Sequence, residues 1–221
     1  MTLSLAAHLD GAFGLVISSS SPAVASRCSH LRAGVGAVAS QNVTNPALGS
    51  AVLDLLAKER TPDAAVADAL SADPFAAYRQ VTAVDRHGRV AVHSGPLALG
   101  IHGAQTGDGC VAAGNLLASD AVLNEMVIAF TTAAGTLEER LMTALEAAAA
   151  AGGEAGPLRS AGLAVVEGAS WRVSDLRVDD HDDPVRELRR LLSLWMPQKN
   201  DYLTRAVAPA SAPSYGVPGD E

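Results

Sequence analysis

Thr2 is the first residue in the sequence that could act as a nucleophile. It follows Met1, and its side chain is small enough to permit removal of Met1 after synthesis. A threonine hydroxyl beside its own free α-amine is one known arrangement for activating a hydroxyl. The alternative is a plain one, since small residues often follow an initiator Met and an N-terminal strand often serves only its sheet. This segment alone leaves both interpretations open.

Amide and hydroxyl side chains also gather at the ends of two predicted strands. The segment 40–46, Ser-Gln-Asn-Val-Thr-Asn-Pro, connects a strand to a helix, and Asn115 follows Gly114 at the end of another strand. An amide N–H of Asn115 could stabilise an oxyanion, which is a large contribution in acyl transfer. The alternative for both segments is an ordinary turn, in which Asn side chains bond to the backbone.

Possible metal ligands are scattered along the chain. Cys28 and His30 could share one face of a strand, whereas structural zinc sites usually show two close ligand pairs. Cysteines at 28 and 110 are therefore expected in the core, and the aspartates of 179–183 at a helix start. The sequence predicts no metal and no cofactor. A metal-dependent hydrolase stays a third possibility, with ligands from Cys28, His30, His102 or His181.

Two common catalytic motifs are missing from the sequence. Gly34-Val35-Gly36 precedes a predicted strand rather than a helix N-terminus, so it lacks the geometry that binds phosphate. The nucleophile elbow of α/β-hydrolases is absent as well. Nucleotide-binding and α/β-hydrolase functions are therefore not favoured.

Alternating and helical hydrophobic patterns predict the elements that must position these residues. Leu3, Leu5 and Ala7 alternate with small residues, so the chain is expected to begin with a half-buried strand that ends at Asp10-Gly11. Further strands are predicted at 12–18, 35–39, 80–84, 89–93, 110–113, 160–166 and 171–178. Helices are predicted at 46–60, 61–72, 119–134, 136–151 and 183–195.

This order of elements indicates a layered α+β protein. Antiparallel strand pairs alternate with helix pairs, and several strands are apolar on both faces, which favours a four-layer αββα sandwich with the helices outside. Residues 1–205 are expected to form a single domain. Residues 206–221 are rich in Ala, Pro, Ser and Gly and are expected to be a flexible tail.

The amino-acid composition excludes some classes of binding partner for this protein. The formal net charge of −8 argues against nucleic acid, which requires a basic face. No apolar run is long enough to cross a membrane, and no signal segment is recognisable. Two cysteines form no disulfide framework, so a cytoplasmic protein is expected. Its Ala/Val/Leu-rich helices predict a homo-oligomer, a dimer or higher, and the remaining expected partner is a small-molecule substrate.

Several segments together resemble one known family, the domain-of-unknown-function 1028 (DUF1028) family. The resemblance extends to about Leu192, and the segments that carry it are Arg27–Asn42, Arg79–Val81, Gly114–Leu117 and Leu176–His181. That family is similar in fold to the N-terminal nucleophile (Ntn) hydrolases, which implies an αββα sandwich. In Ntn hydrolases the residue exposed by processing attacks an amide carbonyl, and its own α-amine serves as base. The resemblance places Thr2 at the nucleophile position.

The resemblance implies hydrolysis of a C–N bond in a small linear or cyclic amide or ureido metabolite. Thr2 would be the catalytic nucleophile and Asn115 the oxyanion donor, while substrate would be positioned by His30, Arg32, Gln41, Asn42 and Asp179. Many family members carry Lys or Arg where this chain has Ser20, and a positive charge there would tune the terminal amine. Arg27 or Arg32 could replace that charge. The alternative is an Ntn-like protein that binds a small molecule or a partner without turnover.

Overall fold

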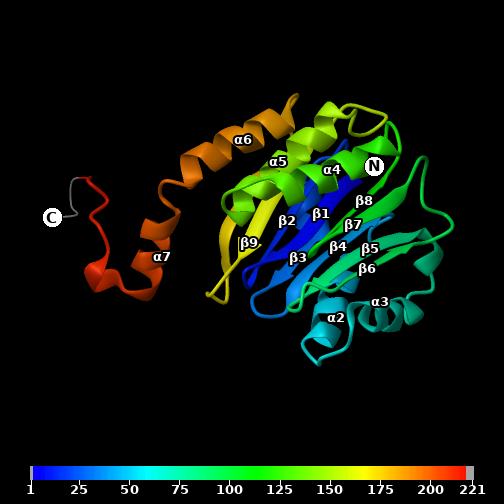
Figure 1. Cartoon of the computed structure of the whole chain (residues 1–221), viewed down its shortest axis with the longest axis horizontal. Helices are drawn as coiled ribbons and strands as arrows, with labels where there is room; N and C mark the ends of the chain where they lie inside the picture. Colours follow the sequence, from blue (N-terminus) through cyan, green and yellow to red (C-terminus); the bar gives the residue numbers. More distant parts are fainter. Residues whose placement is uncertain (1, 218–221) are drawn as a thin grey trace.

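The computed structural model describes residues 2–217 and contains two antiparallel β-sheets stacked face to face (Figure 1). The larger sheet contains, in spatial order, β10 (Arg172–Val178), β9 (Ser160–Val166), β2 (Ala12–Ser19), β1 (Thr2–Leu9), β8 (Cys110–Asn115) and β7 (Gly103–Gly107). The smaller sheet contains β3 (Ser29–Arg32), β4 (Gly36–Asn42), β5 (Arg79–Asp85) and β6 (Val90–Ser94).

Helices cover the outer face of each sheet and complete the four layers. The larger sheet is covered by α4 (Ala121–Thr132), α5 (Leu137–Ala150) and α6 (Pro184–Trp195). The smaller sheet is covered by α2 (Pro46–Leu56) and α3 (Pro62–Ser71), which lie at the bottom of Figure 1. The predicted αββα sandwich is confirmed. None of the helices within residues 2–217 has both the length and the apolar character needed to span a membrane.

The alternation predicted for the first strand decides where Thr2 points. Leu3, Leu5 and Ala7 pack in the cluster beneath α4 and α5, whereas Ala6 belongs to the apolar layer between the sheets. Because successive side chains of a strand point to opposite faces, Thr2 lies on the face directed at the smaller sheet. β1 is paired on both sides, with β2 and with β8, so it is an interior strand.

Small residues allow the layers to approach each other closely. A Cβ atom added at Gly14 of β2 would lie 2.5 Å from Cδ1 of Leu141 on α5. A side chain at Gly49 of α2 would overlap the ring of His30 on β3. Both glycines therefore mark positions where a helix rests directly on a strand.

The structure corrects the predicted path between residues 22 and 32. The sequence indicates only that Cys28 and His30 could share a strand face, but the segment forms α1 (Val24–Cys28) followed at once by β3. Cys28 therefore ends a helix and does not share a strand face with His30. The helix has only five residues and begins after Ala23 in a left-handed conformation, so it offers too little periodicity to recognise.

Other differences from the predicted elements within residues 2–217 are four additional short elements and the position of the domain boundary. The structure adds β7 in the glycine-rich segment and α7 (Lys199–Val207) after α6, along with the 3₁₀ turns η1 (Ala76–Tyr78) and η2 (Pro209–Ser211). The predicted domain boundary at 205 falls inside α7, which stands apart from the sandwich in Figure 1. Asp120 precedes α4 but makes no side-chain cap bond, whereas Thr61 and Thr136, at which two predicted helices begin, accept backbone N–H groups of α3 and α5.

Candidate functional site

Thr2 lies at the beginning of β1, between the ends of two neighbouring strands. It is directly opposite Asn115 of β8 in the antiparallel register. On the other side Leu3 is opposite Ser18, so the register places Thr2 beside Ser19 at the end of β2. Only 4% of Thr2 is exposed. The structure therefore brings together two residues predicted to be catalytic, Thr2 and Asn115.

A buried network of side-chain amides connects this end of β1 to the smaller sheet. Ser4 Oγ donates to Gln41 Oε1 (2.7 Å), and Gln41 Nε2 donates to Gln80 Oε1 (2.8 Å) and to the carbonyl of Ala113 (3.1 Å). Asn115 Nδ2 also donates to Gln80 Oε1, at 3.1 Å. Gln41, Gln80 and Asn115 are all fully buried. Gln41, which was predicted to bind substrate, is thus part of the support beneath Asn115.

The network fixes which way the Asn115 amide faces. Gln80 Nε2 donates to Ser94 Oγ (2.9 Å) and to the carbonyls of Gly103 (3.3 Å) and Gly114 (3.0 Å), so Gln80 Oε1 must face Asn115. Asn115 consequently directs an N–H at Gln80. Its Oδ1 is buried and has no hydrogen-bond partner among residues 2–217. The atom that Asn115 leaves unsatisfied beside Thr2 is therefore an acceptor, and one of its two N–H groups is already engaged.

Glu154 is a residue at this site that the sequence did not reveal. It lies between α5 and β9 and forms an isolated β-bridge with Leu117, two residues beyond Asn115. Its Oε2 accepts the backbone N–H of Ser20 at 3.0 Å, one residue beyond the end of β2. Burial raises the pKa of Glu154 to about 7, although hydrogen bonds from Ser20 oppose the shift. A single carboxylate after two glycines is a common loop pattern, so it carried no signal.

Hydrogen bonds connect the guanidinium group of Arg27 to this site. Arg27 Nη2 donates to Ser21 Oγ (2.6 Å), and Ser21 Oγ lies 2.8 Å from Ser19 Oγ. Two hydroxyl groups thus connect the guanidinium to the residue beside Thr2. Ser20, where many relatives were expected to carry a cation, instead contacts Glu154.

Arg32 and His30 lie elsewhere. Arg32 is opposite Gly36, at the far end of β4 from Gln41, and forms an exposed ion pair with Asp54 at 2.8 Å. His30 is opposite Val38, which packs beneath α2, so His30 lies on the outer face of the smaller sheet. Burial lowers the pKa of His30, which favours the neutral ring. The structure does not bring either residue to Thr2.

Asn42 and Asp179 have local partners. Asn42, at the end of β4, has a positive φ of 72°, and its Nδ2 donates to the carbonyl of Tyr78 at 2.5 Å. Its Oδ1 accepts the N–H of Leu99, so it ties two loops together. Asp179 follows β10, pairs with Arg177 at 3.0 Å, and its carbonyl accepts the N–H of Ala23.

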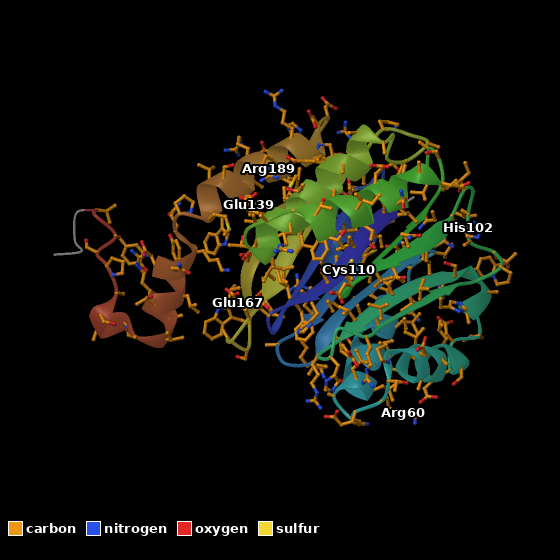
Figure 2. The ribbon with its side chains drawn as sticks, in the orientation of Figure 1. Arg60, His102, Cys110, Glu139, Glu167 and Arg189 are labelled. Carbon is orange, nitrogen blue, oxygen red and sulfur yellow. The ribbon has the colours of Figure 1, made fainter. Side chains whose placement is uncertain are left out.

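The residues considered as metal ligands are not assembled. Figure 2 places His102 and Cys110 in separate regions, and His102 is exposed whereas Cys110 is fully buried. Cys28 lies 3.5 Å from Thr44 Oγ1, and burial raises the pKa of both thiols, to about 11 for Cys110. Within the described part of the chain, no group of three or more His, Cys, Asp or Glu side chains could hold a metal ion.

Several surface cavities lie away from Thr2. An apolar groove of about 250 Å³ lies between β10 and the last two helices, and it is lined by Trp171, Trp195, Lys199 and Tyr202 among others. A polar cavity of about 280 Å³ lies where three strand turns meet, and it includes His8, His87 and Arg140. Neither cavity includes Thr2, Asn115 or Glu154.

Several solved structures resemble this chain, including one DUF1028 protein and two Anbu structures. The crystal structure of protein SPO2555 from Silicibacter pomeroyi, assigned to DUF1028, is 33% identical, covers 88% of each chain and has a TM-score of 0.82. The Anbu (Gly-1) mutant and Anbu from Hyphomicrobium sp. strain MC1 are each 13% identical, with TM-scores of 0.45 and 0.41. They cover 98% and 97% of this chain and all of the Anbu chains. No curated protein matches the sequence.

The family resemblance noted in the sequence is confirmed. The model of the DUF1028 family, described as a family of unknown function, matches residues 2–188. This match includes Thr2, Asn115 and Glu154 and ends within α6. The chain therefore belongs to the DUF1028 family.

Proposed function

We propose that this protein hydrolyses a C–N bond in a small linear or cyclic amide or ureido compound, with Thr2 as nucleophile after loss of Met1. The observation that carries the proposal is the position of Thr2. It begins an interior strand, lies on the face of β1 that carries Ser4 of the buried amide network, and is directly opposite Asn115. An N-terminal threonine held at a fixed strand end combines nucleophile and base in one residue.

The proposed reaction has two halves. The Thr2 α-amine accepts the hydroxyl proton as Oγ1 attacks the amide carbonyl, and that proton then passes to the leaving nitrogen. Water next attacks the resulting ester and releases the acid. Asn115 retains one N–H beyond the bond to Gln80, and this N–H would donate to the oxyanion of each tetrahedral intermediate. Gln80 keeps Asn115 in a fixed orientation for this purpose.

A substrate screen tests the proposal. Small amides, ureido compounds, lactams and imides would be offered to the wild-type protein, Thr2→Ala and Thr2→Ser, after intact mass has shown whether Met1 is absent. We expect hydrolysis by the wild type, reduced hydrolysis by Thr2→Ser, and loss of hydrolysis in Thr2→Ala. Equal rates for wild type and Thr2→Ala would refute Thr2 as the nucleophile, as would hydrolysis by protein that retains Met1.

A second candidate is a binding protein without turnover. It is favoured by the burial of Thr2, only 4% exposed, and by the location of the two cavities described above, neither of which Thr2 lines. Full retention of Met1 together with saturable binding of a small molecule to both wild type and Thr2→Ala would support this candidate over hydrolysis.

The proposed setting is the cytoplasm, and the supporting observation is that Cys28 and Cys110 are both free and buried. Self-association through apolar helix surfaces stays a prediction, and light scattering of the purified protein would test it. The proposed partner is the small-molecule substrate.

A further inference from the structure

Glu154 lies across the beginning of β1. β1 is flanked by β2 and β8, and Glu154 contacts the chain just beyond the end of each. Its carboxylate accepts the N–H of Ser20, which follows β2, and its backbone bridges Leu117, which follows β8. The residue is 4% exposed. Glu154 therefore lies at the end of the sheet at which β1 begins.

One carboxylate oxygen of Glu154 has no hydrogen-bond partner within residues 2–217. Oε2 accepts from Ser20, but Oε1 is buried and has no partner among the described residues. Leaving such an oxygen unsatisfied is unfavourable, because it has lost its hydration without gaining a donor. Asn115 Oδ1, opposite Thr2, is unsatisfied in the same way. One buried acceptor is therefore opposite Thr2, and the other belongs to the carboxylate bonded to Ser20, one residue beyond the Ser19 that lies beside Thr2.

We propose that Glu154 binds the α-ammonium group of Thr2 once Met1 has been removed, and so acts as a positioning residue for the N-terminal amine. This inference rests on the removal of Met1 in the proposed function. An α-ammonium carries three N–H donors, of which Glu154 Oε1 and Asn115 Oδ1 can each accept one. Proteolytic removal of Met1 would thereby supply a donor to two buried acceptors that have none among residues 2–217.

The charges around this position favour such a pair. Arg27 of α1 is the cation, and its guanidinium is linked to Ser19 of β2 through the hydroxyl group of Ser21. The side chains from β1, β4, β5 and β8 in the amide network are the neutral Ser4, Gln41, Gln80 and Asn115. Glu154 is the carboxylate in this group. An ammonium at Thr2 would therefore be attracted by the Glu154 carboxylate, and the hydroxyl groups of Ser19 and Ser21 would separate it from the guanidinium of Arg27.

The test measures the terminal amine itself. Protein that begins at Thr2 would be prepared by cleavage of a fusion protein, as wild type, Glu154→Gln and the control Glu125→Gln, which alters an exposed carboxylate on α4. The rate of α-amine acetylation would be followed against pH by mass spectrometry of the N-terminal peptide. Only the neutral amine reacts, so the profile gives its pKa.

We expect Glu154→Gln to lower the pKa of the Thr2 amine by about one unit or more, because a nearby carboxylate stabilises the ammonium. At a fixed pH below that pKa, labelling would be about tenfold faster than in wild type. Glu125→Gln should match wild type. Identical profiles for wild type and Glu154→Gln would overturn the inference.

A second measurement covers the case in which Glu154→Gln does not fold. Nα-acetylation of the folded, Thr2-initiated wild type removes the ammonium without touching Glu154, and it should lower the thermal midpoint. An unchanged midpoint would overturn the inference. Neither measurement depends on substrate. A shifted amine pKa without hydrolysis would refute only the proposed function, and hydrolysis without that shift would refute only the role of Glu154.

Discussion

Replacing Gln80 by Leu should strongly destabilise the protein, because Gln80 is the centre of the buried amide network. Its Oε1 accepts from Gln41 (2.8 Å) and Asn115 (3.1 Å), and its Nε2 donates to one hydroxyl and two carbonyls. Leu is similar in size but offers no hydrogen bond, so the partners stay buried and lose the bonds that Gln80 made.

The magnitude follows from these partners. Each buried polar group left unsatisfied costs about 1–3 kcal/mol, although Gln41 Nε2 keeps its bond to Ala113. We therefore expect Gln80→Leu to lose about 2–4 kcal/mol of unfolding free energy. In a domain of this size that loss corresponds to a fall of roughly 5–15 °C in the thermal midpoint.

Urea unfolding would measure the loss, with Gln105→Leu as the matched control. Gln105 is an exposed residue of β7 in the same fold, so its replacement should change stability by no more than about 0.5 kcal/mol. A loss below about 1 kcal/mol for Gln80→Leu, or equal losses for both variants, would show that the network is not bonded as described. The orientation assigned to Asn115 would then lose its basis.

Two further predictions concern buried charges. Lys199→Met should cost about 3–5 kcal/mol, because it leaves Glu138, only 1% exposed and 2.7 Å from Lys199 Nζ, without its counter-ion. The exposed Lys58→Met is the control, and similar urea midpoints for the two variants would contradict the prediction. Burial raises the pKa of Glu154 in the folded chain to about 7, so the native state holds this proton more tightly than the unfolded state, and stability should fall as pH rises from about 4.5 to about 7. In Met1-retaining protein the fall should be smaller for Glu154→Gln than for wild type, and parallel stability profiles would rule out Glu154 as its source.

Much of the layered fold could be predicted because its signals are local. The alternation of Leu3, Leu5 and Ala7 gave both the strand and the face on which Thr2 lies. Thr61 and Thr136 marked helix starts that the structure confirms. The elements that were missed, α1, β3, β7 and α7, are short or polar, and β7 lies in a glycine-rich segment. Short segments of this kind depend on contacts with residues distant in the chain, and no local sequence pattern records those contacts.

For the candidate site, the sequence identified individual residues, whereas the fold decided how they are arranged. Thr2 and Asn115 were found as residues, but the register that sets them opposite each other came from the sheet. In the sequence, Arg27 and Arg32 are equally suited to supply the positive charge that Ser20 does not provide. The fold distinguishes them, because Arg32 pairs with Asp54 whereas Arg27 is linked to Ser19 through Ser21.

The sequence by itself determined the period of each strand and helix, the layered arrangement that these periods favour, and a threonine beside a removable methionine. These properties depend on backbone geometry over a few residues. The tertiary structure alone decided that Asn115 turns its oxygen away from Gln80 and that a loop carboxylate, Glu154, lies at the start of β1 with a pKa near 7. Hydrogen-bond direction and desolvation arise from residues distant in the chain, so they exist only once the sheets have stacked.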